Sequence, residues 1–357
     1  EIQPTVSLTV DSNSMGETGG SVTLTATLSY VNSASTSVTL GTSGTAVGGG
    51  TDFTLSSSTI TIAAGNTTGT ATLSSVGDSI SDPTETVIVD ITNVSGGDNA
   101  TEATPAQRQT VTITDDEALP VISLSSSAST VSEANASVTL TVTATPASSS
   151  VITVNLAETG TASGGGVDYS LGAGVLNISA GSTTATTSIT AVDDGIYDPA
   201  ETVIIDISSV SGGGATESGS QQETVTITDD EGAPTVSLSV DSNTVSEGDG
   251  VGARTVTVTL SNTASDNVTV GLSTSGTTTG GGVDYTLNSN SLLIAAGSTT
   301  ASTALDISED LLIEGTETII VDISSVTNSI GITENGVQTE TINLTDNEAG
   351  PTVSISS

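Results

Sequence analysis

Residues 137–145 read Ser-Val-Thr-Leu-Thr-Val-Thr-Ala-Thr, so that every second residue is apolar and the residues between are serine or threonine. The same alternation appears in residues 22–26 and 256–260. A period of two with many β-branched residues is typical of a strand that buries one face and exposes the other to water. No segment has convincing helical periodicity, so the sequence predicts an all-β protein.

The chain repeats itself with a period as long as a whole domain. A short motif close to Pro-Thr-Val-Ser-Leu opens each repeat, at Pro4, Pro120, Pro234 and Pro351. These prolines are 116, 114 and 117 residues apart, which gives each repeat enough chain to bury its own core. We therefore predict module 1 at residues 1–118, module 2 at 119–232, module 3 at 233–350, and the start of a truncated fourth module at 351–357.

About seven strand-like runs, separated by Gly, Asn, Asp and Ser turns, fall in each module. This number and spacing favour a seven-stranded antiparallel β-sandwich of the immunoglobulin-like kind. In module 2 we expect the strands at residues 121–125, 137–145, 152–156, 174–178, 184–191, 201–210 and 223–228. Only a few residues separate the acidic end of one module from the proline of the next. The three sandwiches are therefore expected to lie end to end as an elongated rod.

Composition restricts the function. The 357 residues include 41 Asp and Glu but only two Lys and Arg and no His, for a net charge of −39. Such a charge repels phosphate backbones and anionic lipids, so nucleic acid is not an expected partner. No run approaches the roughly 18 apolar residues of a membrane span, so membrane insertion is not expected. The chain begins at Glu1 without Met, and we expect a mature or excised piece.

The absence of Cys rules out disulfides and thiolate metal sites. In a secreted protein this composition indicates a bacterial extracellular location, either free or at the cell surface. An enzyme is not expected, because the chain offers no His, Cys or Lys as base or nucleophile. Paired carboxylates could in principle hydrolyse glycosides, but such sites need sugar-stacking aromatic residues, and aromatic residues are only 1% of this chain.

Acidic residues recur at fixed offsets in the three modules, in turns or at strand ends. One Glu lies thirteen residues after the opening proline, one Asp follows a triple-Gly segment, a dense acidic run comes later, and an acidic triplet, or Asp-Asn-Glu in module 3, closes the module. The candidate ligands in module 1 are Glu17, Asp52, Asp78, Asp82, Glu85, Asp115 and Asp116. Those in module 2 are Glu133, Asp168, Asp193, Asp194, Asp198, Glu201, Asp229, Asp230 and Glu231. Those in module 3 are Glu247, Asp284, Glu309, Asp310, Glu314, Glu317, Asp346 and Glu348.

Strand ends of a sandwich meet at two poles, so these acids can converge on one of them. Any single acid in a turn is most simply a solvated surface group, but repetition at fixed offsets in three copies favours a common site. Carboxylates held this close repel one another unless a cation neutralises them. Calcium, which takes six to eight oxygen ligands, suits such a site better than magnesium, and zinc or copper would require His or Cys.

Four features of module 2 together resemble the Calx-β domain: Val-Ser-Glu at 131–133, a Gly-rich turn before Asp-Tyr at 168–169, the acidic run at 193–201 and Asp-Asp-Glu at 229–231. All three modules match. That family is a seven-stranded sandwich found in sodium/calcium exchangers, an integrin subunit and many large bacterial surface proteins. Its calcium-binding members hold several ions at the pole facing the next domain. The resemblance implies that the acids of module 2 are ligands and that Ile196 offers a backbone carbonyl.

Two departures distinguish the modules. Module 1 has Gly77 where module 2 has Asp193, and module 3 has the neutral Asn347 where module 2 has Asp230. We therefore expect several calcium ions per module, bound most strongly in module 2.

These features predict a calcium-binding structural segment of an extracellular bacterial stalk, adhesin or surface filament, in which ions at the module joints stiffen the array. Its partners would be neighbouring modules, with other copies in a filament or an adhesion target as further possibilities. One alternative is a fibre subunit joined through exposed strand edges, because the chain has no lysines to guard those edges. Another alternative is a set of regulatory calcium-sensor domains.

Overall fold

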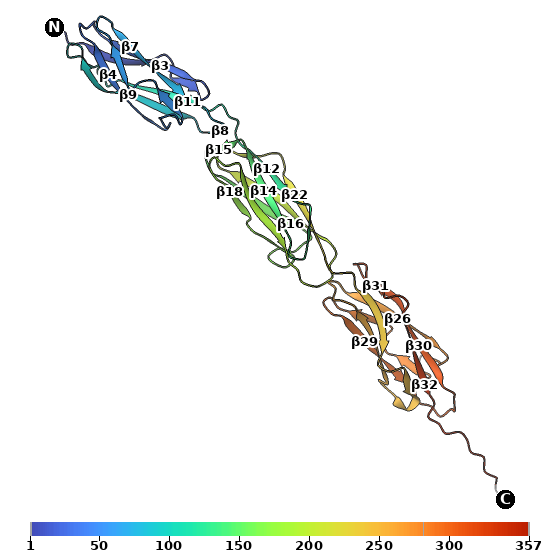
Figure 1. The fold of residues 1–357 in the computed structure, drawn as a ribbon. Coiled ribbons are helices and arrows are strands. Elements are labelled where there is room, and N and C mark those ends of the chain that lie inside the picture. Colours follow the sequence, from blue (N-terminus) through green and yellow to red (C-terminus); the bar gives the residue numbers. More distant parts are fainter. Residues whose placement is uncertain (1, 281, 356–357) are drawn as a thin grey trace.

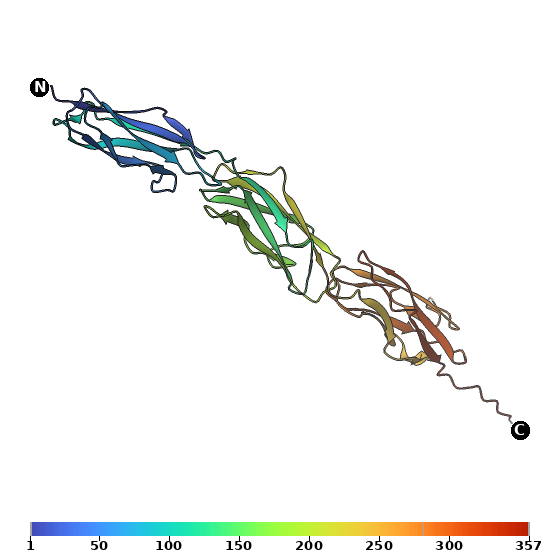
Figure 2. The same cartoon turned by 45° about the horizontal axis from the view of Figure 1, so that its top comes forward.

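The computed structural model describes residues 2–280 and 282–355. Three β-sandwiches follow one another along one axis, with the N-terminus at one end and the C-terminus at the other (Figure 1). The arrangement is equally linear after a 45° rotation (Figure 2). The predicted all-β fold and elongated array are therefore confirmed. Among the described residues, no helix is long and apolar enough to cross a membrane.

Module 2 contains all seven predicted strands together with four short ones. Its strands are β12 (Val121–Ser126), β13 (Thr130–Ser132), β14 (Ser137–Thr145), β15 (Ala147–Ser148), β16 (Ile152–Gly160), β17 (Tyr169–Leu171), β18 (Val175–Ile178), β19 (Thr184–Ala191), β20 (Glu201–Ser211), β21 (Thr216–Glu217) and β22 (Gln222–Thr228). Ten of them form two five-stranded sheets, in the orders β17-β19-β14-β12-β21 and β13-β22-β20-β16-β18, and β15 pairs with β8 of module 1. The long strands pair antiparallel, and the short β13 and β21 add parallel edges.

The other two modules repeat this arrangement. Module 1 contains β1 (Thr5–Val10), β2 (Ser14–Gly16), β3 (Ser21–Leu28), β4 (Thr36–Gly44), β5 (Phe53–Leu55), β6 (Thr59–Ile62), β7 (Thr68–Ser75), β8 (Ile80–Ser81), β9 (Glu85–Gly96), β10 (Thr101–Glu102) and β11 (Arg108–Thr114). Module 3 contains β23 (Thr235–Val240), β24 (Thr244–Ser246), the 3-10 helix η1 (Glu247–Asp249), β25 (Arg254–Leu260), β26 (Val268–Gly276), β27 (Tyr285–Leu287), β28 (Ser291–Ile294), β29 (Thr300–Ile307), β30 (Glu317–Thr327), β31 (Thr333–Glu334) and β32 (Thr339–Thr345).

Each sandwich has its own aliphatic core. The alternation in β14 explains how the core forms, because Leu140 and Val142 are fully buried while the threonines between apolar residues remain partly or fully exposed. Burying a leucine or valine side chain contributes about 1.5 to 3 kcal/mol. The aromatic residue after each Gly-rich turn, which is Phe53, Tyr169 or Tyr285, is buried at the start of a short strand.

The modules touch through backbone pairing. Between modules 1 and 2, β8 pairs parallel with β15, and the Ser149 N–H donates to the Ser81 carbonyl at 3.1 Å. Between modules 2 and 3, Tyr197 forms a parallel bridge with Ala264. The Tyr197 hydroxyl also donates to the Ile330 carbonyl at 3.1 Å. Both joints are thus held by hydrogen bonds as well as by the short linkers.

Candidate metal centre

Each sandwich ends in a pole where acidic side chains from separate segments meet. In module 1, the parallel pairing of β2 with β11 ends at Gly16 and Thr114. The next residues, Glu17 and Asp115, therefore leave the sheet side by side. The Glu17 N–H donates to the Thr114 carbonyl at 2.9 Å. In module 2 the Glu133 N–H makes the same bond, also at 2.9 Å, to the residue that ends β22.

The Gly-rich loop supplies another acid to each pole. In module 2 it begins after Gly160, whose φ of 126° suits glycine, and a Cβ there would lie 2.1 Å from the Thr202 carbonyl oxygen. The loop closes on itself, because one carboxylate oxygen of Asp168 accepts the Ser163 N–H. The equivalent aspartates of the other modules are held in the same way. The second carboxylate oxygen is not used in this turn.

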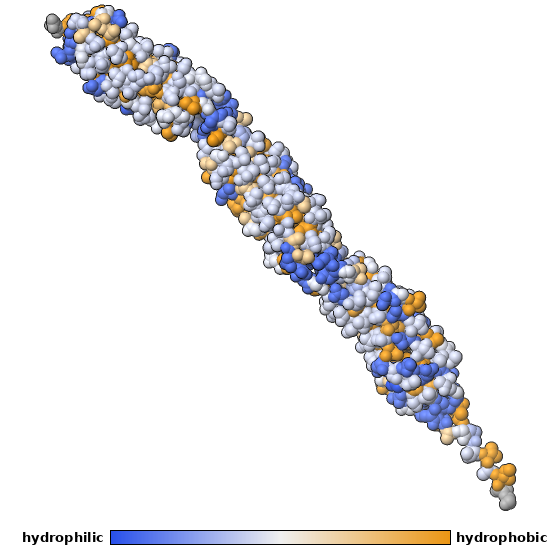
Figure 3. All heavy atoms as spheres, viewed as in Figure 1, coloured by the Kyte–Doolittle hydropathy of each residue, from blue (hydrophilic) through white to orange (hydrophobic). Residues whose placement is uncertain are grey.

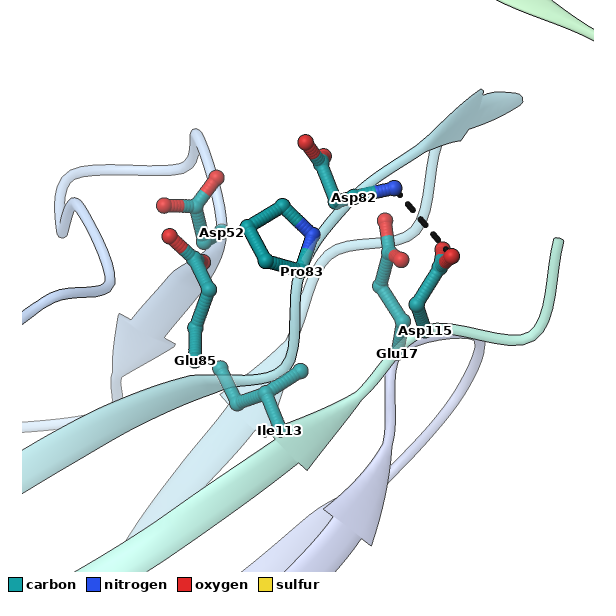
Figure 4. Close-up of a pocket in the computed structure, with 7 residues that line it drawn as sticks. All are labelled: Glu17, Asp52, Asp82, Pro83, Glu85, Ile113 and Asp115. Carbon is teal, nitrogen blue, oxygen red and sulfur yellow. Dashed lines mark hydrogen bonds between the residues drawn. The ribbon is translucent and has the colours of Figure 1, made fainter. Parts of the chain in front are cut away.

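In module 1 these acids surround a small pocket (Figure 4). The carboxylates belong to Glu17, Asp52, Asp82, Glu85 and Asp115, and the apolar residues Pro83 and Ile113 complete the lining. Its volume is about 10 Å³, close to the space that one water-sized particle needs. Module 2 has the same pocket, of the same volume, lined by the carboxylates Glu133, Asp168, Asp198, Glu201 and Asp229.

A second cluster lies at the pole of every module, and in modules 1 and 2 it shares two acids with the first pocket. One carboxylate oxygen from each of three residues lies within 4.8 Å of the other two. The triads are Glu17, Asp115 and Glu117 in module 1; Glu133, Asp229 and Glu231 in module 2; and Glu247, Asp346 and Glu348 in module 3. Within the described residues, module 2 alone has a further triad, formed by Asp193, Asp230 and Glu231. Hydrophilic residues accordingly gather where successive sandwiches meet (Figure 3).

Little positive charge is available to balance these poles. The sequence has two cationic side chains. Arg108 pairs with Asp90 at 2.7 Å, at the end of β11 opposite Asp115. Arg254 lies 3.5 Å from Asp249 in module 3. In the part of the chain that the structure describes, the poles of modules 1 and 2 therefore contain no basic side chain that could balance their carboxylates.

Burial and the repulsion between neighbouring carboxylates raise the pKa values of several glutamates at the poles. Burial raises the pKa of Glu17, Glu133 and Glu247 to about 7, and nearby carboxylates add to the shift. The pKa values of Glu85 and Glu201 also rise to about 7, first through burial and then through the neighbouring Gly-loop aspartate. Without a cation, the ionised forms of these groups are therefore unfavourable.

The donor set fits a hard cation. All side-chain donors are carboxylate oxygens, and Glu247, only 4% exposed, has an Oε2 atom without a hydrogen-bond partner. Asp115 Oδ1, Glu117 Oε2, Glu231 Oε2, Glu317 Oε2 and Glu348 Oε2 are likewise buried and unpartnered. Buried acceptors without donors are costly, and a bound cation satisfies them. Many anionic oxygens in turns are typical of calcium sites.

Comparison with protein families accounts for the repeated geometry. The model of the Calx-beta domain matches residues 1–117, 115–231 and 229–348. The chain belongs to the Calx-beta family. No curated protein matches the chain.

Solved structures similar to this Calx-beta array include CBD12 from CALX1.2, which is 18% identical. That match has a TM-score of 0.29 and covers 63% of this chain and 99% of the other. A tetra-tandem repeat in the extending region of a large adhesion protein is 16% identical, with a TM-score of 0.33. It covers 96% of this chain and 73% of the other.

The three Calx-beta poles differ where the sequences depart from one another. In module 1 Asp78 donates its N–H to Glu17 Oε1 at 3.1 Å, and Asp116 accepts a bond from the Thr18 hydroxyl. In module 3 the Asn347 amide donates to both carboxylate oxygens of Glu309, at 3.1 and 3.3 Å. The Asn347 amide thus hydrogen-bonds a carboxylate whose counterpart in module 2, Asp193, lies beside the carboxylate of Asp230.

The remaining predicted residues lie around the same poles. In module 2 Asp194 Oδ1 accepts the Ile196 N–H at 2.8 Å, and Asp310 makes the corresponding bond in module 3. In module 3 burial raises the pKa of Glu314, with further contributions from the charges of Glu317, Asp284, Asp310 and Asp346. Ligation by any of these residues, including the Ile196 carbonyl, stays a prediction.

One acid of the clusters was not among the predicted ligands. Glu117 belongs to the triad of module 1, although the sequence analysis selected only Asp115 and Asp116 from that triplet. The available signal was the recurrence of Asp-Asp-Glu, which places Glu117 in register with Glu231. Asp90, which was not predicted as a ligand, pairs with Arg108 on a sheet surface and lies outside the pole.

Proposed function

We propose that this chain is a calcium-binding structural segment of a bacterial secreted or cell-surface protein, such as a stalk, adhesin or filament. Residues 1–118, 119–232 and 233–350 would each act as one rigid module. The observation that supports the proposal is the convergence of one buried and two partly buried carboxylates within 4.8 Å of one another at each pole. Bringing carboxylates this close costs free energy unless a cation offsets their mutual repulsion.

The loops that carry these acids also form the contacts between modules. Ion binding to the loops would therefore stiffen the joints. Asp78 and Asp82 flank β8, whose two residues pair with module 2. Asp194 and Asp198 flank Tyr197, which bridges to module 3. A bound calcium ion supplies positive charge and coordination sites for carboxylate oxygens. An ion that binds the acids on both sides of a joint loop restricts the conformations of that loop. It thereby also fixes the backbone pairing between the loop and the next module.

Several residues could hold more than one ion per module. The pocket acids, such as Glu133, Asp168 and Glu201, would hold one ion. The triad built on Asp229 and Glu231 would hold a second ion nearer the next module. Within the pole, the backbone keeps part of this geometry without an ion, because the N–H of Asp198 donates to Asp229 Oδ2 at 3.0 Å.

Small-angle X-ray scattering tests the rod directly. With about 1 mM calcium, the native chain should give the distance distribution of a stiff rod, and with chelator a broader one with a lower maximum dimension. The D198N variant should lose part of the calcium response at the second joint, because Asp198 lies at the module 2 pole and contacts Ser265 of module 3. The control D206N removes the same charge from β20, away from the pole. Identical native curves with and without calcium would contradict a stiffening role.

The preference for module 2 can be tested by restoring its missing acid in module 3. We expect N347D to tighten calcium binding to module 3 by about tenfold, because an amide donor to Glu309 becomes a carboxylate ligand. Isothermal titration calorimetry of the native chain and of the variant measures the change. The control D241N alters one charge in the turn after β23. Equal or weaker affinity in N347D would mean that Asn347 does not limit the site.

A further inference from the structure

The contact between modules 1 and 2, here called joint 1, and the contact between modules 2 and 3, called joint 2, share one backbone geometry. Ser81 and Tyr197 are equivalent, because each precedes an Asp whose N–H donates to the Asp after the last strand of its module. The Ser81 carbonyl accepts the Ser149 N–H, and the Tyr197 carbonyl accepts the Ser265 N–H, both at 3.1 Å. β8 and β15 mark joint 1, where the first two sandwiches meet (Figure 1). The joints differ in their side chains.

In joint 2 the Tyr197 side chain reaches into module 3. Its ring packs against the apolar core of that module. Its hydroxyl donates to the Ile330 carbonyl at 3.1 Å. On the same loop, the Gly195 carbonyl accepts the Thr263 hydroxyl at 3.3 Å. A tyrosine that buries part of its ring and satisfies its hydroxyl is a typical anchor of a protein interface.

Joint 1 has no such anchor. The side chain at the equivalent position is the small hydroxymethyl group of Ser81. On the facing edge, the Ser148 hydroxyl is used within its own module, where it accepts the Ser150 N–H at 3.1 Å. Among residues 2–280 and 282–355, no hydrophobic side chain of module 1 packs against the core of module 2, and no side-chain hydrogen bond joins these two modules. Joint 1 is therefore held by backbone pairing and its linker.

A hollow remains in joint 1 where joint 2 has the tyrosine ring. Its volume is about 250 Å³. An enclosed cavity of about 150 Å³ already holds benzene, so a phenol ring would fit. The lining comes from both modules and the linker: Ser81, Asp82, Pro83, Leu119, Ser148, Ser150, Gly213 and Gly214. Ser148 pairs with Ser81 as Ala264 pairs with Tyr197. Gly213 follows β20 as Ile330 follows β30. The hollow thus corresponds to the place that Tyr197 fills.

The module 2 side of the hollow has little side-chain material of its own. Gly213 and Gly214 have φ angles of 56° and 66°, which favour glycine. A Cβ at Gly214 would lie 2.8 Å from a side-chain atom of Leu119. Leu119 itself is 61% exposed, so it covers the hollow only in part. The equivalent linker residue in joint 2 is the smaller Ala233. A larger side chain at position 81 is therefore the direct way to fill the hollow.

We propose that Tyr197 locks joint 2, whereas joint 1, which has Ser81 at the same position, is the hinge at which this array bends. Bending joint 2 withdraws the Tyr197 ring from the core of module 3 and exposes apolar surface to water, which costs free energy. Bending joint 1 breaks backbone hydrogen bonds that water can replace, and no ring leaves a core. The inequality does not rest on the proposed calcium function, because both joint loops carry equivalent acids, Asp82 and Asp198.

Distances between spin labels compare the two joints directly, and the chain has no Cys of its own. Thr70, Thr186 and Ser302 are the third residues of the equivalent strands β7, β19 and β29, and all three are exposed. The variant T70C/T186C therefore spans joint 1, and T186C/S302C spans joint 2 from matched positions. By pulsed electron paramagnetic resonance in calcium, we expect the distance distribution across joint 1 to be about twice as wide as that across joint 2.

Exchanging the anchor between the joints tests the cause. S81Y/L119A gives joint 1 the tyrosine and the small linker residue of joint 2, and should narrow the joint 1 distribution to about the width of joint 2. Y197S removes the anchor and should widen the joint 2 distribution about twofold. The control T84Y adds a tyrosine at an exposed site beside the same loop, outside the hollow, and should leave joint 1 unchanged. Calorimetry of each variant verifies that its modules are folded.

Repeating the measurements in chelator separates this proposal from the calcium function. If calcium stiffens the joints, both distributions widen in chelator, and joint 1 should remain the wider one. Widths that do not respond to chelator would contradict calcium stiffening and leave the hinge standing. Equal widths across the two joints of the native sequence, or a joint 2 distribution that Y197S does not widen, would overturn the hinge.

Discussion

Chelating calcium from the native chain will lower the melting temperature of its modules by about 10 °C. A ligand present at about one hundred times its dissociation constant stabilises the folded state by about 2.7 kcal/mol. For a module of this length, each kcal/mol shifts the melting temperature by roughly 4 °C. Two ions in one module would increase the shift further. Differential scanning calorimetry suits the measurement, because three separate cores can give three transitions.

The size and cation dependence of this shift distinguish ligation from charge screening. Sodium chloride at equal ionic strength should raise the melting temperature by only a small part of the calcium effect, because buried pairs are screened poorly. Magnesium should be less effective, since it requires a strict octahedral geometry and releases its waters reluctantly. If sodium reproduced the whole calcium shift, the poles would be a solvated acidic surface and not binding sites.

Much of the fold was predictable because the signal was local. A period of two, as in residues 137–145, depends only on which face of one strand is buried. The seven predicted strands of module 2 agree with the observed ones to within a few residues, apart from the longer end of β16. The short strands were not predicted. β8 and β15 have two residues each, and their pairing depends on how two modules meet.

The acids that form the site were predictable from the sequence, but the contacts that these acids make were not. Fixed offsets in three copies marked residues such as Glu133 and Asp168, and the structure brings them to one pocket. Offsets cannot reveal that Asn347 bonds Glu309, because that contact depends on side-chain conformation. They also cannot reveal that Tyr197 contacts module 3. Nothing in the sequence around Tyr197 indicates which module its side chain contacts, because the residue is a single tyrosine within an acidic run.

Each joint loop both presents acids to its pole and contacts the next module. These two roles together restrict which insertions a loop tolerates. In module 2 the loop must present Asp194 and Asp198 to the pole while its tip, Tyr197, reaches Ala264. Side-chain alternation meets both demands, since neighbouring residues of an extended segment point to opposite sides. Insertion of a residue between Tyr197 and Asp198 would therefore disturb the joint and the pole together.

The E133Q variant should reverse the sign of its effect on stability when calcium is added. Glu133 is 6% exposed, and the charges of Asp194, Asp229 and Asp198 face it. In chelator, replacing the carboxylate by a neutral amide relieves repulsion, and we expect module 2 to melt a few degrees higher, for a gain on the order of 1 kcal/mol. In calcium the variant loses a ligand shared by the pocket and the triad. The calcium affinity should fall at least tenfold, and most of the 10 °C shift of module 2 should disappear.

The crossing of the two stability curves is the informative result, because no purely structural role produces it. A glutamate that mattered only for packing or hydrogen bonding would make E133Q equally destabilising with and without calcium. The matched control D206N removes one charge from the same module at a strand position away from the pole, and its curves should stay parallel to those of the native chain. Titration calorimetry on the same samples gives the affinity independently of melting. If E133Q bound calcium as tightly as the native chain, Glu133 would not be a ligand, and its burial would require another explanation.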